Sequence, residues 1–156
     1  MDLPNDHDPL DLDRQVCFPL YAASNLLNRL YRPILSGLGL TYPQYLVMLV
    51  LWKQAPQTVG SLGDMLHLDS GTLTPLLKRM EQAGLVSRTR DPEDERRVLI
   101  GLTEKGSVLR ADAEKVPGML SAGLELDETT VAELRDQVRS LVAVLQGSPS
   151  LVGRRP

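Results

Sequence analysis

The sequence predicts a mainly α-helical fold with a small β-hairpin, organised as a winged helix-turn-helix with flanking helices at both ends. Aromatic residues make up only 4% of the 156 residues and leucine is abundant, which favours helices over sheets. Two short amphipathic helices joined by a polar turn precede two β-type runs. Further apolar residues recur at helical spacing near both ends. The length and mixed composition are those of one domain, expected to cover residues 1–156.

Two helices are expected before residue 55. Asp11 or Asp13 can cap the first, and apolar residues follow at helical spacing until "SGLGL" ends it. Pro19 lies early enough to bend this helix rather than break it. The second helix is expected in "TYPQYLVMLVLWKQ", which starts at Thr41 and is apolar on nearly every side. This pattern predicts a short buried helix at the centre of the fold.

A helix-turn-helix is expected next. Thr58 can cap "VGSLGDMLHL", and Asp69 can cap "SGTLTPLLKRMEQAG", which Gly84 ends. The second of these helices has one polar and one apolar face. Ser70, Thr74 and Lys78 form the polar face, and the apolar face is formed by Leu73, Leu76, Leu77 and Met80. Helix-turn-helix proteins place the start of such a helix in the major groove, where hydroxyls and basic side chains can contact DNA. Any amphipathic surface helix would show the same division, so DNA contact remains a hypothesis at this point.

The runs "LVSRTR" and "RVLIGL" predict a β-hairpin whose tip, "DPEDER", is charged. Arg96 and Arg97 stand at the foot of this projecting loop. An arginine here could enter a minor groove, with Asp94 holding its guanidinium in place. The alternative is a solvated turn with a weak surface ion pair.

Two more helices are expected after the hairpin. Thr103 can cap "TEKGSVLRADAEK", and an interruption is expected around "VPGML" because of Pro117 and Gly118. Beyond Asp127 apolar residues follow helical spacing to "GSPS". These terminal helices have few partners left inside the chain, so pairing with a second copy is expected. The dimerisation helices are placed at about 11–40 and 103–147, and the DNA-binding region at about 41–102.

Charge and composition exclude several classes of protein. The formal net charge of −3 argues against a uniformly basic nucleic-acid binder, although basic residues gather between 78 and 97. No apolar run reaches the roughly 18 residues of a membrane span, and the start "MDLPNDHDPLDLDR" is acidic, unlike a secretion signal, so a cytoplasmic protein without membrane contact is expected. One cysteine forms no internal disulfide, and with the scattered His7 and His67 it supplies no metal cluster.

Cys17 is the only cysteine, and two tyrosines share its face of the predicted first helix. Tyr21 lies one turn beyond it and can approach directly. Tyr31 points in a similar direction but lies about 21 Å along the helix axis, so it can reach only the Cys17 of a second copy packed antiparallel. Phenol hydroxyls donating to the sulfur would stabilise its thiolate, which attacks peroxides. The alternative is an inert buried cysteine beside amphipathic core tyrosines.

Several stretches resemble one known family. "LDSGTLTPLLKRMEQAGLV" and "RDPEDERRVLIGLTEKG" resemble the recognition helix and wing of the MarR family of winged-helix repressors. "CFPLYAASNLL", "YRPIL" and "LTYPQYLVMLVLW" resemble its organic hydroperoxide resistance regulators. The resemblance implies a homodimeric repressor without a cofactor. It would bind a pseudo-palindromic double-stranded operator when reduced and release it when an organic hydroperoxide oxidises its sensor cysteine.

The same resemblance implies roles for individual residues. The sensor corresponds to Cys17, the two tyrosines that the partner subunit contributes to its sulfur correspond to Tyr31 and Tyr42, and Tyr21 matches a further tyrosine nearby. In the wing, the DNA-contacting arginine corresponds to Arg96, with Asp94 as its partner. On the helix that resembles the recognition helix, the candidate DNA-contacting residues are Ser70, Thr72, Thr74, Lys78 and Arg79.

One departure from the family pattern affects the chemistry. Many such regulators carry a second cysteine that resolves the sulfenic acid, whereas small residues such as Ser121 and Ala122 stand where it would be expected. Oxidised Cys17 would then form a mixed disulfide with a small thiol or proceed to sulfinic and sulfonic acid. Two other functions stay open: a repressor released by a non-covalent phenolic ligand, with Cys17 structural, and a one-cysteine thiol peroxidase. The second is disfavoured because an enzyme has no use for a winged helix-turn-helix.

Overall fold

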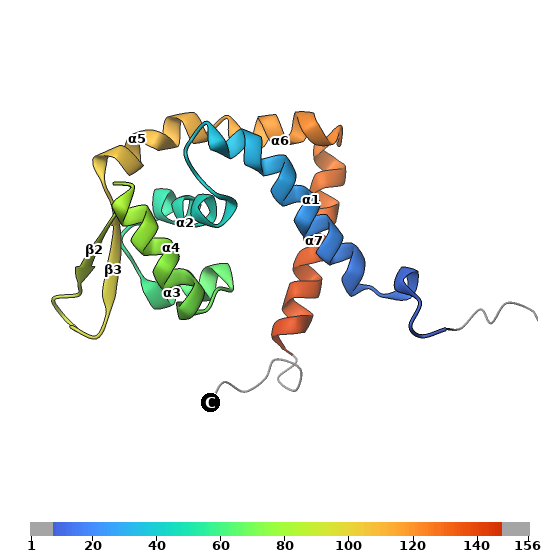
Figure 1. Ribbon diagram of the computed structural model, residues 1–156, viewed down its shortest axis with the longest axis horizontal. Helices are drawn as coiled ribbons and strands as arrows, with labels where there is room; N and C mark the ends of the chain where they lie inside the picture. The colour runs from blue at the N-terminus through green and yellow to red at the C-terminus, as the bar shows by residue number, and fades with distance from the viewer. Residues whose placement is uncertain (1–7, 148–156) are drawn as a thin grey trace, which may run out of the picture. The chain divides into compact units, whose positions relative to one another are not determined.

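A computed structural model describes residues 8–147 (Figure 1). The chain divides into two compact units, one ending at Pro117 and the other beginning at Gly118. The earliest acidic residues, His7 and the "SPS" of the expected C-terminal stop lie outside the described residues. None of the described helices is long and apolar enough to cross a membrane.

The first α-helix begins later than the sequence predicted. Asp11 does act as a cap, but of a short 3₁₀ turn, η1 (Leu12–Arg14), where its carboxylate accepts a hydrogen bond from the Asp13 N–H at 3.1 Å. Helix α1 (Cys17–Ser36) starts only after Val16, which offers no capping side chain. Pro19 falls in the first turn of α1, where a missing N–H costs no hydrogen bond. Cys17 is therefore the first residue of the helix and not a residue within it.

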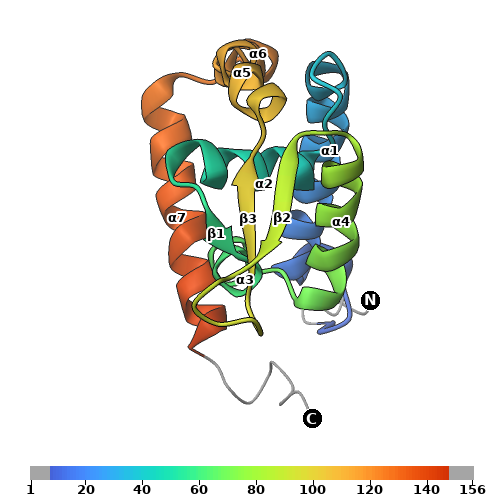
Figure 2. The same ribbon diagram turned by 90° about the vertical axis from the view of Figure 1, so that its left-hand side faces the viewer.

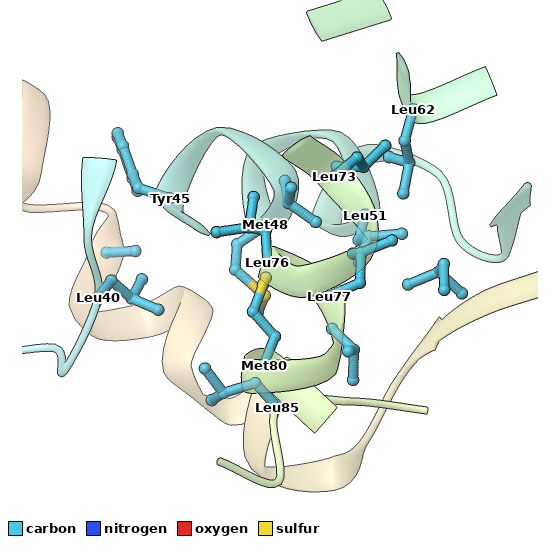
Figure 3. Packing of buried hydrophobic residues seen from close by; sticks show 14 of the residues in the cluster. Leu40, Tyr45, Met48, Leu51, Leu62, Leu73, Leu76, Leu77, Met80 and Leu85 are labelled. Carbon is cyan, nitrogen blue, oxygen red and sulfur yellow. The ribbon is translucent and has the colours of Figure 1, made fainter. Parts of the chain in front are cut away.

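Helix α2 (Tyr42–Lys53) lies at the centre of the first unit, as predicted. The Thr41 hydroxyl accepts from the Gln44 N–H and the Gln44 side chain accepts from the Thr41 N–H, so a capping box fixes its start. Its apolar side chains join one core with those of α4, α1 and the strands (Figure 3). The members of this core that α2 contributes are Tyr45, Val47, Met48 and Leu51.

The helix-turn-helix consists of α3 (Val59–Leu66) and α4 (Ser70–Gln82), with Thr58 and Asp69 as the predicted caps. Strands β2 (Val86–Arg90) and β3 (Val98–Leu102) form the expected hairpin. A third strand, β1 (Gln57–Thr58), was not predicted from the sequence, and it pairs with β3 to give the order β1-β3-β2 (Figure 2). All pairs are antiparallel, with Gln57 opposite Ile100 and Val86 opposite Leu102. Figure 1 shows the β2–β3 hairpin projecting beyond α3 and α4.

Helix α5 (Glu104–Ala113) follows the hairpin with Thr103 as its cap. The expected break at "VPGML" was misplaced, because the chain turns at Glu114 and Lys115 and α6 (Val116–Leu124) then begins. Pro117 and Gly118 belong to the first turn of α6, where proline is tolerated.

The second unit contains the rest of α6 and helix α7 (Glu128–Gln146). Asp127, beyond which this helix was expected, caps α7, and its hydrogen bonds from the Thr130 N–H and hydroxyl lower the pKa of the Asp127 carboxyl. An apolar stripe along α7 is exposed in the single chain, formed by Val131, Leu134, Val138, Val142 and Leu145.

The start of α5 packs so closely on the hairpin that Gly106 admits no side chain. A Cβ at this position would collide with the carbonyl oxygen of Leu85. We expect Gly106→Ala to lower the free energy of unfolding by about 2 kcal/mol and the Tm by about 6 °C, despite the higher helix propensity of alanine. Gly118→Ala is the control, since a Cβ there meets nothing within 4 Å. Thermal unfolding of both variants checks this, and an unchanged Tm for Gly106→Ala would contradict the close packing.

Candidate functional site

Three tyrosines gather where the second half of α1 meets the start of α2. The rings of Tyr31 and Tyr42 lie 4.6 Å apart between centroids, and Tyr45 lies 6.1 Å from the first and 6.5 Å from the second. Tyr42 and Tyr45 are one helical turn apart, so α2 presents both on one face. Tyr45 is buried, whereas Tyr31 and Tyr42 are half-buried. Tyr31 and Tyr42 are the two residues for which the family resemblance implies contact with the sensor cysteine of a partner subunit.

Burial keeps these phenols protonated. It raises the pKa of Tyr31 to about 12, with further contributions from Tyr42 and Tyr45. Burial also raises the pKa of Tyr42 and of Tyr45 above the ordinary value. Near neutral pH each hydroxyl can therefore donate a hydrogen bond, and an anionic acceptor is the strongest partner it could find.

Cys17 lies at the other end of α1 and is exposed. Tyr21 is one turn further along and is also exposed, at 68%. Between Cys17 and Tyr31 the helix runs without interruption for 14 residues, which corresponds to about 21 Å. Within one chain the sulfur therefore cannot meet the tyrosine pair. The roles predicted for all four residues remain predictions.

The first half of α1 carries large apolar side chains that face water in the single chain. The exposed side chains are those of Phe18, Tyr21, Leu26 and Leu27 and of Val16 just before the helix, with exposures from 40% to 69%. Large apolar side chains exposed in such number on one helix are typical of an interaction site in a folded protein. The helix that carries the cysteine therefore offers apolar side chains that another surface could cover.

Helix α4 divides as the sequence predicted. Leu73, Leu76, Leu77 and Met80 are at most 5% exposed and belong to the core (Figure 3). The opposite face carries the candidate DNA-contacting residues, of which Thr74 is partly buried and the others are exposed: Ser70, Thr72, Thr74, Lys78 and Arg79.

In the wing, the Arg96 guanidinium is held by Asp94. Its Nε and Nη2 donate to the two carboxylate oxygens at 3.1 and 3.4 Å, and its backbone N–H donates to the same carboxylate at 3.1 Å. These hydrogen bonds lower the pKa of Asp94, so the carboxylate stays ionised. The Arg96 side chain is nevertheless 91% exposed. It is oriented by Asp94 and still open to a phosphate or a groove.

Two wing residues were missed by the sequence reasoning. Asp91 is 6% exposed, and it forms an ion pair with the Arg97 Nε at 3.4 Å and accepts from the Glu93 N–H. The Arg90 guanidinium donates to the Glu95 carbonyl at 2.7 Å. Together these bonds tie the two ends of the loop that presents Arg96. The available signal in the sequence is the charged residues at both ends of "RDPEDERR", which are compatible with a solvated turn as well as with a DNA-contacting arginine.

A cavity of about 380 Å³ lies between α2 and α5, with Tyr45, Trp52 and Lys53 on one side and Arg110 on the other. The Trp52 indole N–H donates to the Gly106 carbonyl at 2.8 Å, which fixes that wall. Over residues 8–147, no three His, Cys, Asp or Glu side chains are placed to hold a metal ion.

Residues 29–112 match the family model described as transcriptional regulator SarA/Rot. The chain is 45% identical over 144 residues to the organic hydroperoxide resistance transcriptional regulator of Bacillus subtilis (strain 168), covering 92% of this chain and 96% of that one. It also resembles the solved structure of reduced AbfR bound to DNA, with a TM-score of 0.76 and 40% identity over 87% of this chain and 93% of the other. Overoxidised AbfR bound to DNA gives a TM-score of 0.69 and 39% identity, covering 86% and 94%.

Proposed function

The chain belongs to the MarR-type winged-helix transcriptional regulators, in the branch of the organic hydroperoxide resistance regulators, and from this membership we propose a redox-controlled repressor. In this proposal a cytoplasmic homodimer binds a pseudo-palindromic operator while Cys17 is reduced. Oxidation of Cys17 by an organic hydroperoxide weakens that binding. Cys17 acts as a stoichiometric sensor and not as the nucleophile of an enzyme.

The observation that carries the proposal is the separation of an exposed cysteine from a tyrosine pair on the same helix. The rings of Tyr31 and Tyr42 lie 4.6 Å apart between centroids, and Cys17 lies about 21 Å from Tyr31 along α1. A second chain packed against the exposed apolar side chains of α1 would bring its own sulfur to this pair. Such an arrangement would cover the apolar side chains of α1 and give the two phenol hydroxyls an anionic acceptor.

The first chemical step follows from these groups. The Cys17 thiolate attacks the outer oxygen of the hydroperoxide, an S–O bond forms as the O–O bond breaks, and the alkoxide takes up a proton to leave as an alcohol. Sulfur is oxidised by two electrons and the peroxide is reduced by two. The phenols stabilise the thiolate before the attack, and a sulfenic acid, which is neutral, binds them less strongly.

The described residues offer one cysteine, so the oxidised sulfur either reacts with a small thiol from outside or proceeds to sulfinic and sulfonic acid. Attack of a small thiol on the sulfenic acid gives a mixed disulfide and water. AbfR, a relative of 39% identity, has been solved overoxidised and still bound to DNA. This supports the mixed disulfide, which adds bulk at the dimer contact, as the state that releases the operator.

Helix α2 links the sensor to the DNA-binding surface. It carries Tyr42 and Tyr45 in its first turn, while Met48 and Leu51 pack in the same core as Leu77 of α4 (Figure 3). Close-packed interiors transmit displacements instead of absorbing them. A new group forced between the tyrosine pair and the sulfur would therefore move α4 and change the spacing of the two recognition helices.

The wing provides a separate test of DNA binding. We expect Arg96→Ala to weaken operator binding about 10- to 100-fold. We also expect the slope of the logarithm of the binding constant against the logarithm of the salt concentration to become less steep by about one, the loss of one phosphate contact. Arg96→Lys is the matched variant, because it keeps the charge and loses the fork that Asp94 holds. Fluorescence anisotropy at several salt concentrations measures both. If both variants bind as the parent does, Arg96 does not contact DNA.

The proposal as a whole is tested on the parent chain. Operator DNA is first selected from a random duplex library by the reduced protein and then titrated with reduced and with hydroperoxide-treated protein in the presence of a small thiol. Release of the DNA, its reversal by dithiothreitol, and a mass increase confined to Cys17 are expected. Tight operator binding by protein whose Cys17 is shown to be in a mixed disulfide would refute the redox mechanism.

The cavity between α2 and α5 favours a second candidate, a repressor released by a non-covalent phenolic ligand with Cys17 structural. Trp52 and Tyr45 offer aromatic surface and Lys53 and Arg110 offer positive charge. Operator release by a phenol, with Cys17 unmodified after mild peroxide treatment, would favour this candidate. Steady consumption of hydroperoxide with a thiol reductant would instead indicate a thiol peroxidase.

A further inference from the structure

A second cavity, of about 450 Å³, adjoins the tyrosine pair. It lies between the second half of α1 and the start of α2. Asn28, Arg32 and Ser36 stand four residues apart on α1 and form one polar wall, and Leu40 and Pro43 form an apolar one. Tyr42 is shared between this cavity and the tyrosine pair. A molecule bound here would contact Tyr42, whose hydroxyl is proposed to hold the sensor sulfur.

Arg32 is a free cation in this cavity. It is exposed, and among residues 8–147 no carboxylate lies within ion-pair distance of it. The wing shows the opposite arrangement, in which Asp94 and Asp91 occupy the guanidinium groups of Arg96 and Arg97. An arginine with a planar fork and no internal partner, set in a cavity with amide and hydroxyl neighbours, is suited to a carboxylate.

The charge of the surrounding sequence favours the same class of ligand. Residues 14–63 include Arg14, Arg29, Arg32 and Lys53 and contain no aspartate or glutamate, although the whole chain has a net charge of −3. This stretch builds all of α1 and α2. The elements around the cavity thus form a stretch of net positive charge within an acidic protein, which attracts anions.

We propose that the cavity binds the carboxylate of anionic organic molecules that react with Cys17, with Arg32 as the binding residue and Leu40 and Pro43 contacting the alkyl part. The inference rests on the proposed redox function. Two reactants could bring the carboxylate: the hydroperoxide that converts the thiolate to sulfenic acid and leaves as an alcohol, or the small thiol that converts the sulfenic acid to a mixed disulfide with loss of water. Arg32 selects for the charged reactant and does not take part in either bond change.

The test compares charged and neutral forms of one reactant. A tertiary-alkyl hydroperoxide that carries a carboxylate, and its methyl ester, are each reacted with the full-length protein, and Cys17 oxidation is followed by quenching and mass spectrometry. In a second arm, Cys17 is oxidised with cumene hydroperoxide and then trapped with free cysteine or with cysteine ethyl ester. The variants are Arg32→Gln and, as the control, Arg29→Gln, which removes the same charge one turn away without lining the cavity.

The parent is expected to prefer the carboxylate form about tenfold in at least one arm, and Arg32→Gln to abolish that preference while leaving the reaction with the neutral form unchanged. The arm that responds identifies the reactant. Equal rates for charged and neutral forms in both arms, or an equal loss in Arg29→Gln, overturns the carboxylate site. Failure of the proposed redox function would give a different result. Cys17 would then not be oxidised by the methyl ester of the hydroperoxide either, or its oxidation would leave operator binding intact.

Discussion

A Cys17→Ser protein is expected to bind the operator as tightly as the reduced parent and to stay bound when organic hydroperoxide and a small thiol are added. The parent should lose affinity by about 10- to 100-fold under the same conditions, the usual size of coupling between two sites. The reason is chemical: a serine hydroxyl does not form a sulfenic acid or a disulfide. Since the chain has one cysteine, no second thiol can substitute. Operator titrations of both proteins, with and without oxidant, give the comparison directly.

The serine variant is a fair test because Cys17 is the exposed first residue of α1 and fills no part of the core. Its substitution should leave the thermal unfolding of the protein unchanged, which serves as the control. Release of the operator from Cys17→Ser as readily as from the parent would show that the oxidant acts elsewhere. The phenol-responsive repressor would then be the better account.

Local features of the fold could be predicted because their causes lie within a few residues. The caps predicted at Thr58, Asp69 and Thr103 each accept a hydrogen bond from a backbone N–H three residues on, and so do Thr41 and Asp127, where the sequence only indicated that a helix begins. The apolar face of α4 was likewise predicted, since helical spacing alone places Leu73 and Leu77 together. The first helix was the exception. Asp11 and Asp13 were both candidates for its cap, but Asp11 caps a 3₁₀ turn that ends before α1 begins.

The remaining features depend on contacts between distant parts of the chain. Strand β1 has only two residues, and its pairing with Ile100 and Leu99 leaves no signal in its own sequence. The burial of Asp91 depends on the path of the hairpin, and Arg97 compensates its charge. Tyr45 lies one turn beyond Tyr42 in a helix that is apolar on nearly every side, so periodicity could not distinguish a member of the tyrosine cluster from ordinary core.

The same limit applies to the candidate sensor. Helix geometry alone separates Cys17 from Tyr31, and it follows that the two can act together only across a dimer. Helix geometry does not predict that the rings of Tyr31 and Tyr42 are in contact, because these residues lie on different helices. The helices are joined by a turn in which Gly39 has a φ of +67°. That meeting depends on the packing of α1 on α2, and it is the part of the site that the structure adds.

Replacing Tyr31 and Tyr42 together by phenylalanine is expected to slow the oxidation of Cys17 about 10- to 100-fold, the loss of one or two hydrogen bonds to a charged group. Both rings stay in place, so the packing on Tyr45 and the affinity of the reduced protein for DNA should change little. Burial raises the pKa of both phenols, to about 12 for Tyr31, so in the parent they remain donors across the neutral range. Stopped-flow competition between hydroperoxide and a fluorescent alkylating agent measures the effect.

Tyr45→Phe is the matched control, because it removes a hydroxyl from the same cluster at the buried position behind the pair. If only donors that reach a sulfur from the partner subunit accelerate oxidation, Tyr45→Phe should oxidise at the parent rate. Parent-like oxidation of the double variant would mean that the sulfur lies elsewhere. If Tyr45→Phe slowed oxidation as much as the double variant does, the cluster would act through its packing instead. Slowing confined to Tyr31 and Tyr42 is the result that places the sensor at the dimer contact, since one chain cannot bring its own Cys17 there.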